Sequence, residues 1–192
     1  MEEPVTGRPE DQGRLLWILR HAKAVPHPGQ GGTDHDRSLT PRGRRDAEAL
    51  GRRLGGDGDR MGLGLHDLPG VVLCSTAART AETARLVLAS LREPPPLHLR
   101  RSLYGAAPES LIDEVRELDE GARTAMVVGH NPGVHQLAMA LVKDGPGADL
   151  LDREGFPTCA VAVVGFPDPR WDTVAEGGGR LVGFYRPPYA MG

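Results

Sequence analysis

Four residues of this sequence are of types that bind and transfer phosphoryl groups, and each follows a short run of apolar residues: Arg20, His21, Arg79 and His130. Guanidinium groups bind phosphate oxygens through paired hydrogen bonds, and a neutral imidazole can attack phosphorus. Nearby cations would offset the charge of the phosphoryl group during its transfer. If the fold brings these four residues together, they predict binding of a dianion such as phosphate and a covalent phosphohistidine intermediate.

The apolar runs before these residues have the pattern of strands that are buried on both faces of a parallel sheet. Leu15–Leu19, Val71–Cys74 and Thr124–Val128 are short, nearly continuous and followed at once by polar or turn residues. Further strands are expected around 97–99, at 159–166, around 171–174 and at 181–185. The candidate residues therefore fall at or beyond the carboxyl ends of predicted strands.

Helix signals alternate with these strands. Thr40 can cap a helix that has Pro41 at its first position, and Ser75 or Thr76 is expected to cap the next helix. The helices expected are 41–54, from 76 to about 91, 108–118 and 132–141. Four successive β–α units predict a three-layer α/β/α sandwich with a mostly parallel central sheet. Such sheets bind ligands beyond the carboxyl ends of their strands.

Length and composition indicate a single globular domain. The chain has 192 residues, of which 39% are hydrophobic, which is enough for one domain with a core. We expect that domain over 14–186. Residues 1–13 are charged and rich in Gly and Pro without an apolar period, and they are expected to form a disordered tail. Residues 187–192 are expected to form a short C-terminal tail.

Charge and hydropathy exclude several classes of partner. A formal net charge of -3 gives no general attraction to nucleic acid or to anionic membranes. The apolar runs are far shorter than the ~18–20 residues of a membrane span, and the acidic start of the chain is unlike a signal peptide. We therefore expect a cytoplasmic protein. No heptad pattern proposes a partner chain, so a monomer is the default expectation.

Other site chemistries have little support. The remaining histidines show neither an HExxH motif nor paired spacing, so no metal and no other cofactor is predicted. Cys74 and Cys159 lie singly in apolar stretches, which is typical of small buried residues. The chain has no GxxxxGK[ST] nucleotide-binding motif, and Ser75 lacks the GxSxG context of a serine hydrolase.

The candidate residues also have simpler interpretations. A histidine at the end of a strand is commonly a boundary residue with ordinary hydrogen bonds. Arg79 lies three residues before Glu82 on the same predicted helix, so a surface ion pair would explain it equally well. The coincidence of four such residues at one predicted sheet edge favours a site.

Three segments in order resemble the signatures of the histidine phosphatase (phosphoglycerate mutase-like) superfamily, and within it those of the SixA-type phosphohistidine phosphatases. Leu19-Arg20-His21-Ala22-Lys23 resembles the Arg-His-Gly signature, 75–84 resembles the Ser-x-x-x-Arg-Ala-x-x-Thr-Ala block, and 128–132 resembles the second-histidine segment. The segment 36–43 is similar to the loop-to-helix entry of SixA-type members. The resemblance spans roughly 14–186 and implies a phosphoglycerate mutase-like fold.

The resemblance also implies roles for individual residues. His21 would be the nucleophile, Arg20 and Arg79 would bind phosphoryl oxygens, and His130 would hydrogen-bond the phosphoryl group. Ala22 stands where the superfamily has glycine, and a methyl group beside the nucleophile is a small intrusion. The resemblance therefore implies a metal-independent phosphatase that works through a phosphohistidine intermediate.

The general acid of the predicted site has several candidates. Mutases and many small-molecule phosphatases of this superfamily carry an acid in an insertion after the third strand, where this chain has only the compact stretch 104–109. Glu109 is a candidate acid, although a carboxylate in the first turn of a helix commonly stabilises the helix instead. Asp34 and Asp36 are rival acids, although their Gly-rich loop favours solvated side chains. Arg37 and Ser75 are candidates to bind substrate.

The chemistry of the leaving group then favours one function. An alkoxide that leaves a phosphomonoester needs a proton, whereas the imidazole that leaves phosphohistidine is a far weaker base. We therefore expect a phosphatase that acts on phosphohistidine, carried by a histidine-phosphotransfer or phosphocarrier protein. The alternative is a phosphomonoesterase that acts on a small phosphorylated metabolite with Glu109 or Asp34 as acid. A third hypothesis is an inactive module that binds phosphorylated ligands.

Overall fold

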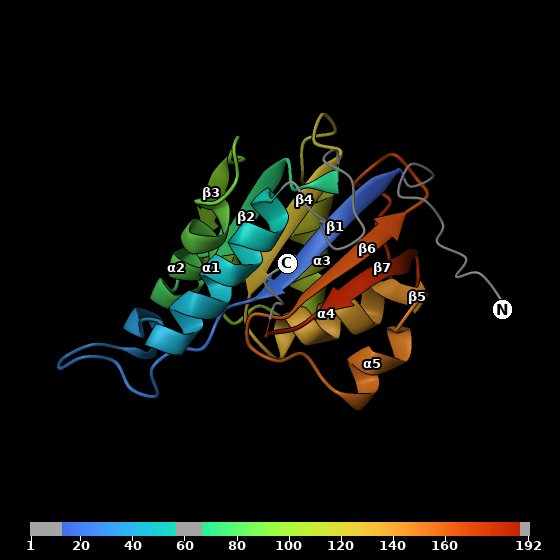
Figure 1. Ribbon diagram of the computed structural model, residues 1–192. Coiled ribbons are helices and arrows are strands. Elements are labelled where there is room, and N and C mark those ends of the chain that lie inside the picture. Colours follow the sequence, from blue (N-terminus) through green and yellow to red (C-terminus); the bar gives the residue numbers. More distant parts are fainter. Residues whose placement is uncertain (1–12, 57–66, 189–192) are drawn as a thin grey trace, which may run out of the picture.

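The computed structural model describes residues 13–56 and 67–188, in which strands and helices alternate along most of the chain (Figure 1). The tail predicted at 1–13 lies outside the described residues except for Gly13, whose backbone N–H donates to Phe166 O at 2.7 Å. The tail predicted at 187–192 lies outside them from 189 onward.

A central sheet of seven strands has the order β3-β2-β4-β1-β6-β7-β5. Its parallel part consists of β1 (Arg14–Arg20), β2 (Val71–Ser75), β3 (Leu97–Arg100) and β4 (Thr124–Gly129). On the other side of β1, β6 (Val161–Phe166) pairs with it in antiparallel orientation. Strand β7 (Gly179–Tyr185) is antiparallel to β6, and the short β5 (Val142–Asp144) is parallel to β7. The predicted mostly parallel sheet is confirmed, and the carboxyl ends of β1, β2 and β4 meet at one edge.

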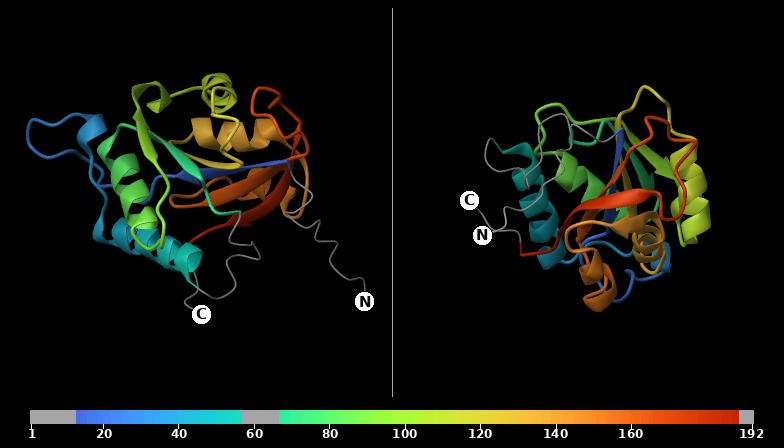
Figure 2. Two further views of the ribbon diagram at one scale, coloured as in Figure 1. Left: turned by 90° about the horizontal axis from the view of Figure 1, so that it is seen from above. Right: turned by 90° about the vertical axis from the view of Figure 1, so that its right-hand side faces the viewer.

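Helices cover both faces of the sheet (Figure 2). One face packs against α1 (Pro41–Gly55) and α2 (Ala78–Leu88), and the other packs against α3 (Pro108–Arg116), α4 (Gly133–Leu141) and the short α5 (Ala148–Arg153). Two single-turn 3₁₀ helices, η2 (Asp34–Asp36) and η4 (Arg101–Leu103), lie in the loops after β1 and β3. The three-layer sandwich predicted from the alternating pattern is confirmed.

The side chains of β1 divide between two cores because successive residues of a strand point to opposite faces. Leu15, Trp17 and Leu19 pack with α1 and α2, while Leu16 and Ile18 pack with α3 and α4. All five are fully buried. This explains why the first strand reads as a continuous apolar run rather than an alternating one, and it fixes the strand that carries Arg20 at its end.

Two details of the predicted elements are wrong. The second helix begins after Ala77, which makes no side-chain cap, while the Ser75 hydroxyl bonds to His130 instead of acting as the helix cap. The segment 171–174 is a turn and not a strand. It carries the buried Trp171, whose indole N–H donates to Ala122 O at 2.6 Å, so burial of one large ring explains its apolar character.

Candidate active site

The four candidate residues are brought to one edge of the sheet. In the strand register Arg20 is opposite Gly129, the residue before His130, and Cys74, the residue before Ser75, is opposite Val128. The rings of His21 and His130 have their centroids 5.2 Å apart. The predicted convergence at the carboxyl ends of the strands is therefore confirmed.

The imidazole of His21 is held in a defined state. Its Nδ1 lies 2.7 Å from the carbonyl oxygen of Ala22, which can only accept, so Nδ1 carries the hydrogen and Nε2 keeps its lone pair. The residue is only 9% exposed, and burial, with the charges of Arg79 and Arg20 as smaller causes, lowers the pKa of His21 to about 4. The ring is therefore neutral at neutral pH.

The backbone around His21 is fixed by two further contacts. Ala22 N–H donates to Thr83 Oγ1 at 3.0 Å, and the same hydroxyl donates to Arg79 O at 2.6 Å. The carbonyl of His21 accepts from Cys159 N at 3.1 Å. Since Thr83 lies one helical turn after Arg79, helix α2 positions both an arginine of the site and the peptide beside the nucleophile candidate.

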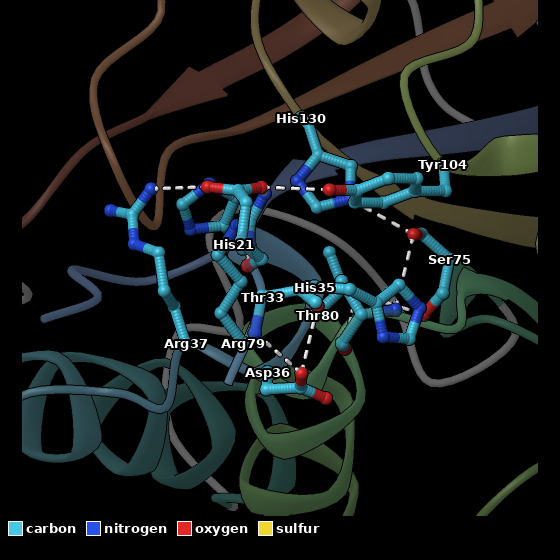
Figure 3. A network of polar contacts seen from close by, with 12 residues as sticks. His21, Thr33, His35, Asp36, Arg37, Ser75, Arg79, Thr80, Tyr104 and His130 are labelled. Atoms are coloured by element: carbon cyan, nitrogen blue, oxygen red, sulfur yellow. Dashed lines mark hydrogen bonds and ion pairs between the residues drawn. The ribbon is translucent and has the colours of Figure 1, made fainter. Parts of the chain in front are cut away.

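His130 contacts several other side chains of the site. Its Nε2 is 2.9 Å from Ser75 Oγ, and its ring meets the Tyr104 ring edge to face at 5.5 Å (Figure 3). Burial, followed by the charge of a protonated His21, lowers the pKa of His130 to about 3. Its Nδ1 is buried and has no hydrogen-bond partner among the described residues. A buried polar atom of this kind is costly unless a ligand completes its hydrogen bonding.

The two arginines are held differently. Arg79 is 6% exposed, and its Nη1 and Nη2 donate to the backbone oxygen and to Oδ2 of Asp34 at 2.7 and 2.9 Å. Arg20 donates from Nη1 to Phe156 O at 2.7 Å, while its Nε is buried without a partner in the described part of the chain. Asn131 donates to the same Phe156 carbonyl at 3.0 Å. The site therefore has guanidinium N–H groups and an imidazole nitrogen that can bind an anion.

Comparison with known proteins places this geometry in a family. The model of the histidine phosphatase superfamily (branch 1) matches residues 16–103. An uncharacterised protein of Mycobacterium tuberculosis is 39% identical over 172 residues, which cover 88% of this chain and 99% of that protein. The chain belongs to the histidine phosphatase superfamily. It is a phosphatase of the histidine-nucleophile class, and the match includes Arg20, His21 and Arg79.

Solved structures narrow the family to the SixA type. A proposed phosphohistidine phosphatase SixA from Nakamurella multipartitia is 32% identical with a TM-score of 0.69, and the alignment covers 91% of this chain and 96% of that one. A second, from Agrobacterium tumefaciens, is 28% identical with a TM-score of 0.71, with coverage of 91% and 98%. The fold, phosphoglycerate mutase-like in the sequence prediction, is the one that these SixA-type structures share.

The two candidate aspartates of this SixA-type site are exposed, as expected for their polar loop, but both carboxylates are hydrogen-bonded. That of Asp34 accepts from Arg79, from Arg37 Nη1 at 2.8 Å and from the Tyr104 hydroxyl at 2.8 Å, which the sequence did not predict. These donors, Arg37 first, hold the pKa of Asp34 well below its usual range. Asp36 accepts from the backbone and hydroxyl of Thr33 and thereby closes the turn of η2.

Two further expectations for the SixA-type site concern Glu109 as an acid and the pairing of Arg79 with Glu82. Glu109 is exposed in the first turn of α3 and makes no hydrogen bond or ion pair with the described residues, so no polar contact links it to the site. The proposed pairing of Arg79 with Glu82 is wrong, since Glu82 accepts from Arg44 Nε at 2.6 Å and from Leu39 N at 2.9 Å. Arg79 instead contacts Asp34, on the loop after β1.

Two aromatic residues were missed as parts of the SixA-type site. Tyr104 packs against His130 and bonds to Asp34, and the His35 ring lies 5.0 Å from the Tyr104 ring and bonds to Thr76 Oγ1 at 2.9 Å. Both side chains appear in the same polar network (Figure 3). The position of Tyr104 in the sequence could have identified it as a site residue. It follows strand β3, whose carboxyl end lies at the same edge of the sheet as the other candidate residues.

The described residues contain no group of three or more His, Cys, Asp or Glu side chains placed to hold a metal ion. Nor do they include a helix that is long and apolar enough to span a membrane. Cys74 and Cys159 are buried, as expected, and are not joined by a disulfide; burial raises the pKa of both thiols.

Proposed function

We propose that this SixA-type phosphatase removes phosphate from phosphohistidine on a protein, with His21 as the nucleophile. The observation that carries the proposal is the state of the His21 ring. Its Nδ1–H is bound by the Ala22 carbonyl, so the lone pair of Nε2 is available while the buried ring stays neutral. A neutral nucleophile beside buried cations suits attack on a phosphoryl dianion.

In the first step the lone pair of His21 Nε2 forms a bond to phosphorus as the P–N bond of the substrate breaks. The electron pair of that bond returns to the ring nitrogen of the departing histidine. Arg79 uses two of its five guanidinium N–H groups on Asp34 and retains others for phosphoryl oxygens, and the unpartnered Nε–H of Arg20 adds a further donor.

In the second step water attacks phosphorus on phospho-His21, and inorganic phosphate leaves as His21 regains its lone pair. His130 is suited to hold the phosphoryl group through both steps. Ser75 Oγ accepts from Ala77 N at 3.4 Å, so its own hydrogen can be donated to His130 Nε2. His130 then carries its hydrogen on Nδ1, the buried atom without a partner, and can donate it to a phosphoryl oxygen.

The proposed partner is a histidine-phosphotransfer or phosphocarrier protein. Support comes from the absence of a large insertion after β3, where only η4 and the short stretch 104–107 separate the strand from α3. The described part of the chain therefore places no long segment over the site from this side. SixA-type relatives are named for phosphohistidine phosphatase activity, which agrees with this substrate class.

A phosphomonoesterase of the same family is the second candidate, and one observation favours a specific version of it. Asp34 contacts Arg79 and so lies within reach of a bound phosphoryl group, whereas Glu109 makes no contact with the site. Asp34 would therefore be the acid of such an enzyme. Its strongly lowered pKa counts against this role, because an ionised carboxylate has no proton to give an alkoxide.

The test compares kcat/KM on a phosphohistidine-bearing phosphocarrier protein with kcat/KM on a simple alkyl phosphate, without added metal. We expect the phosphohistidine substrate to be preferred. His21→Ala is expected to abolish turnover, and His98→Ala, at an exposed position on β3, serves as the matched control. A wild-type enzyme that prefers the alkyl phosphate would reject the substrate class, and unchanged turnover in His21→Ala would reject the mechanism.

A further inference from the structure

Asp34 occupies a position that the catalytic steps above do not explain. Its side chain is 53% exposed, whereas that of Arg79, to which it is bonded, is 7% exposed. His21 is 9% exposed as a residue. The nucleophile and the phosphate-binding arginine therefore lie at the floor of the site, and the Asp34 carboxylate lies at its mouth. A leaving group that departs in line from a nucleophile at the floor is directed toward the mouth.

The carboxylate of Asp34 has one acceptor position to spare. A carboxylate offers about four lone-pair sites, two on each oxygen. Oδ2 accepts from Arg79 Nη2 and from the Tyr104 hydroxyl, while Oδ1 accepts from Arg37 Nη1 and from no other donor among the described residues. Three donors thus hold the group in place and keep it ionised, and Oδ1 can accept one further hydrogen bond from a substrate.

The surroundings of this free acceptor suit a flat heteroaromatic ring. Tyr104 lies beside Asp34, with the rings of His35 and His130 at 5.0 and 5.5 Å from its own. The labelled rings of Tyr104, His35 and His130 lie around one network in Figure 3. Aromatic rings favour edge-to-face or offset contacts at such distances.

We propose that Asp34 is a specificity-determining residue that accepts a hydrogen bond from the imidazole leaving group of phosphohistidine. This inference rests on the proposed function. The substrate ring carries phosphorus on one nitrogen and hydrogen on the other. When the P–N bond breaks, its electron pair stays on the first nitrogen, and the ring leaves as neutral imidazole with its remaining N–H bound to Asp34 Oδ1.

In the same step the His21 ring undergoes the reverse change. His21 enters as neutral imidazole with Nδ1–H bound to the Ala22 carbonyl, and after transfer its ring carries phosphorus on Nε2 and hydrogen on Nδ1. No proton moves in this exchange, because the positive ring charge passes from the substrate to the enzyme. An ionised Asp34 stabilises the charged substrate ring, and it has no proton for an alkoxide. One carboxylate thereby favours P–N substrates over alkyl esters.

The experiment compares wild type, Asp34→Asn and Asp36→Asn on three substrates: a phosphohistidine-bearing phosphocarrier protein, p-nitrophenyl phosphate and an alkyl phosphate. Asp36 lies on the same turn, and within the described ranges its carboxylate bonds to Thr33 alone, so its variant controls for disturbance of η2. A hydrogen bond to a charged group corresponds to about 10- to 100-fold in rate. We expect Asp34→Asn to lose about that factor in kcat/KM on phosphohistidine and to change less than about threefold on p-nitrophenyl phosphate, whose leaving group needs neither a proton nor an anionic partner. Inhibition by inorganic phosphate reports whether the Arg79 site is intact.

The outcomes separate the inference from the proposed function. Equal losses on all substrates would overturn the inference, since Asp34 would then only position Arg79. A loss confined to the alkyl phosphate would also overturn it and would make Asp34 a general acid. If wild type prefers phosphohistidine and Asp34→Asn keeps that preference, the inference alone fails. If wild type does not prefer phosphohistidine, the proposed substrate class fails and the inference fails with it.

Discussion

The buried, neutral state of His21 predicts a specific loss of stability in mild acid. The pKa of His21 is about 4 in the folded protein, against 6.5 as its ordinary value, and burial is the main cause. The unfolded chain therefore binds the proton first as the pH falls. The stabilisation from neutral His21 is complete above about pH 6.5 and is lost progressively between there and pH 4. For these two pKa values, going from pH 7 to pH 5 costs about 2 kcal/mol.

The measurement is urea unfolding at pH 7 and pH 5 in phosphate-free buffer, for wild type, His21→Gln and His98→Gln. The carboxylates titrate in all three proteins, and burial, the main cause of the lowered pKa of His130, acts in all three as well. We expect wild type to lose about 2 kcal/mol more than His21→Gln between the two pH values. His98→Gln is expected to behave as wild type because His98 is exposed and lies outside the site.

Equal losses in wild type and His21→Gln would refute this reasoning. They would mean that His21 gains its proton as readily in the folded protein as in the unfolded chain. The argument for a neutral nucleophile held by the Ala22 carbonyl would then fail, even if the residue were still required for turnover.

Three further predictions follow from named contacts. Arg79→Lys replaces a planar fork by a single charged point, so KM for phosphohistidine should rise about tenfold or more, and an unchanged KM in steady-state assays would exclude Arg79 from phosphoryl binding. Thr83→Val keeps the shape of the side chain but leaves Ala22 N–H unpaired, which should cost about 1–3 kcal/mol in urea unfolding and lower kcat; full activity would show that this contact does not position His21. Trp171→Ala should cost about 3–5 kcal/mol because it empties a fully buried position. Trp171 bonds to Ala122, which precedes β4 and therefore lies at the edge of the sheet opposite the site. We expect kcat below the melting temperature to be unchanged, and a large loss of kcat would contradict this placement.

The sequence was sufficient to predict the layers and the convergence of four residues, and the reason is local. A strand buried on both faces appears as an apolar run, and the residue at its end is then placed by topology alone. Arg20 and His130 are positioned in this way, and Arg79 follows because α2 begins directly after β2. Their coincidence at one edge required only that the strands be parallel.

The part that could not be predicted depends on contacts between loops. Asp34 lies in a polar, Gly-rich loop, and nothing in its neighbours indicates that η2 turns its carboxylate onto an arginine 45 positions away. The role of Ser75 was misread for a similar reason, because a hydroxyl at the end of a strand can cap a helix or bond across the sheet to His130. Strand β5 and helix α5 are too short to leave a periodic signal.

In the proposed mechanism His21 is the residue that carries the phosphoryl group. The most direct measurement is rapid-quench intact-mass analysis of the wild-type enzyme mixed with a phosphohistidine-bearing protein, followed by peptide mapping under alkaline conditions that preserve phosphohistidine. We predict a transient adduct of one phosphoryl group that is lost in acid, maps to His21, and is absent from His21→Ala but present in His98→Ala. Turnover of the same substrate without any such adduct, or an adduct on another residue, would contradict the account.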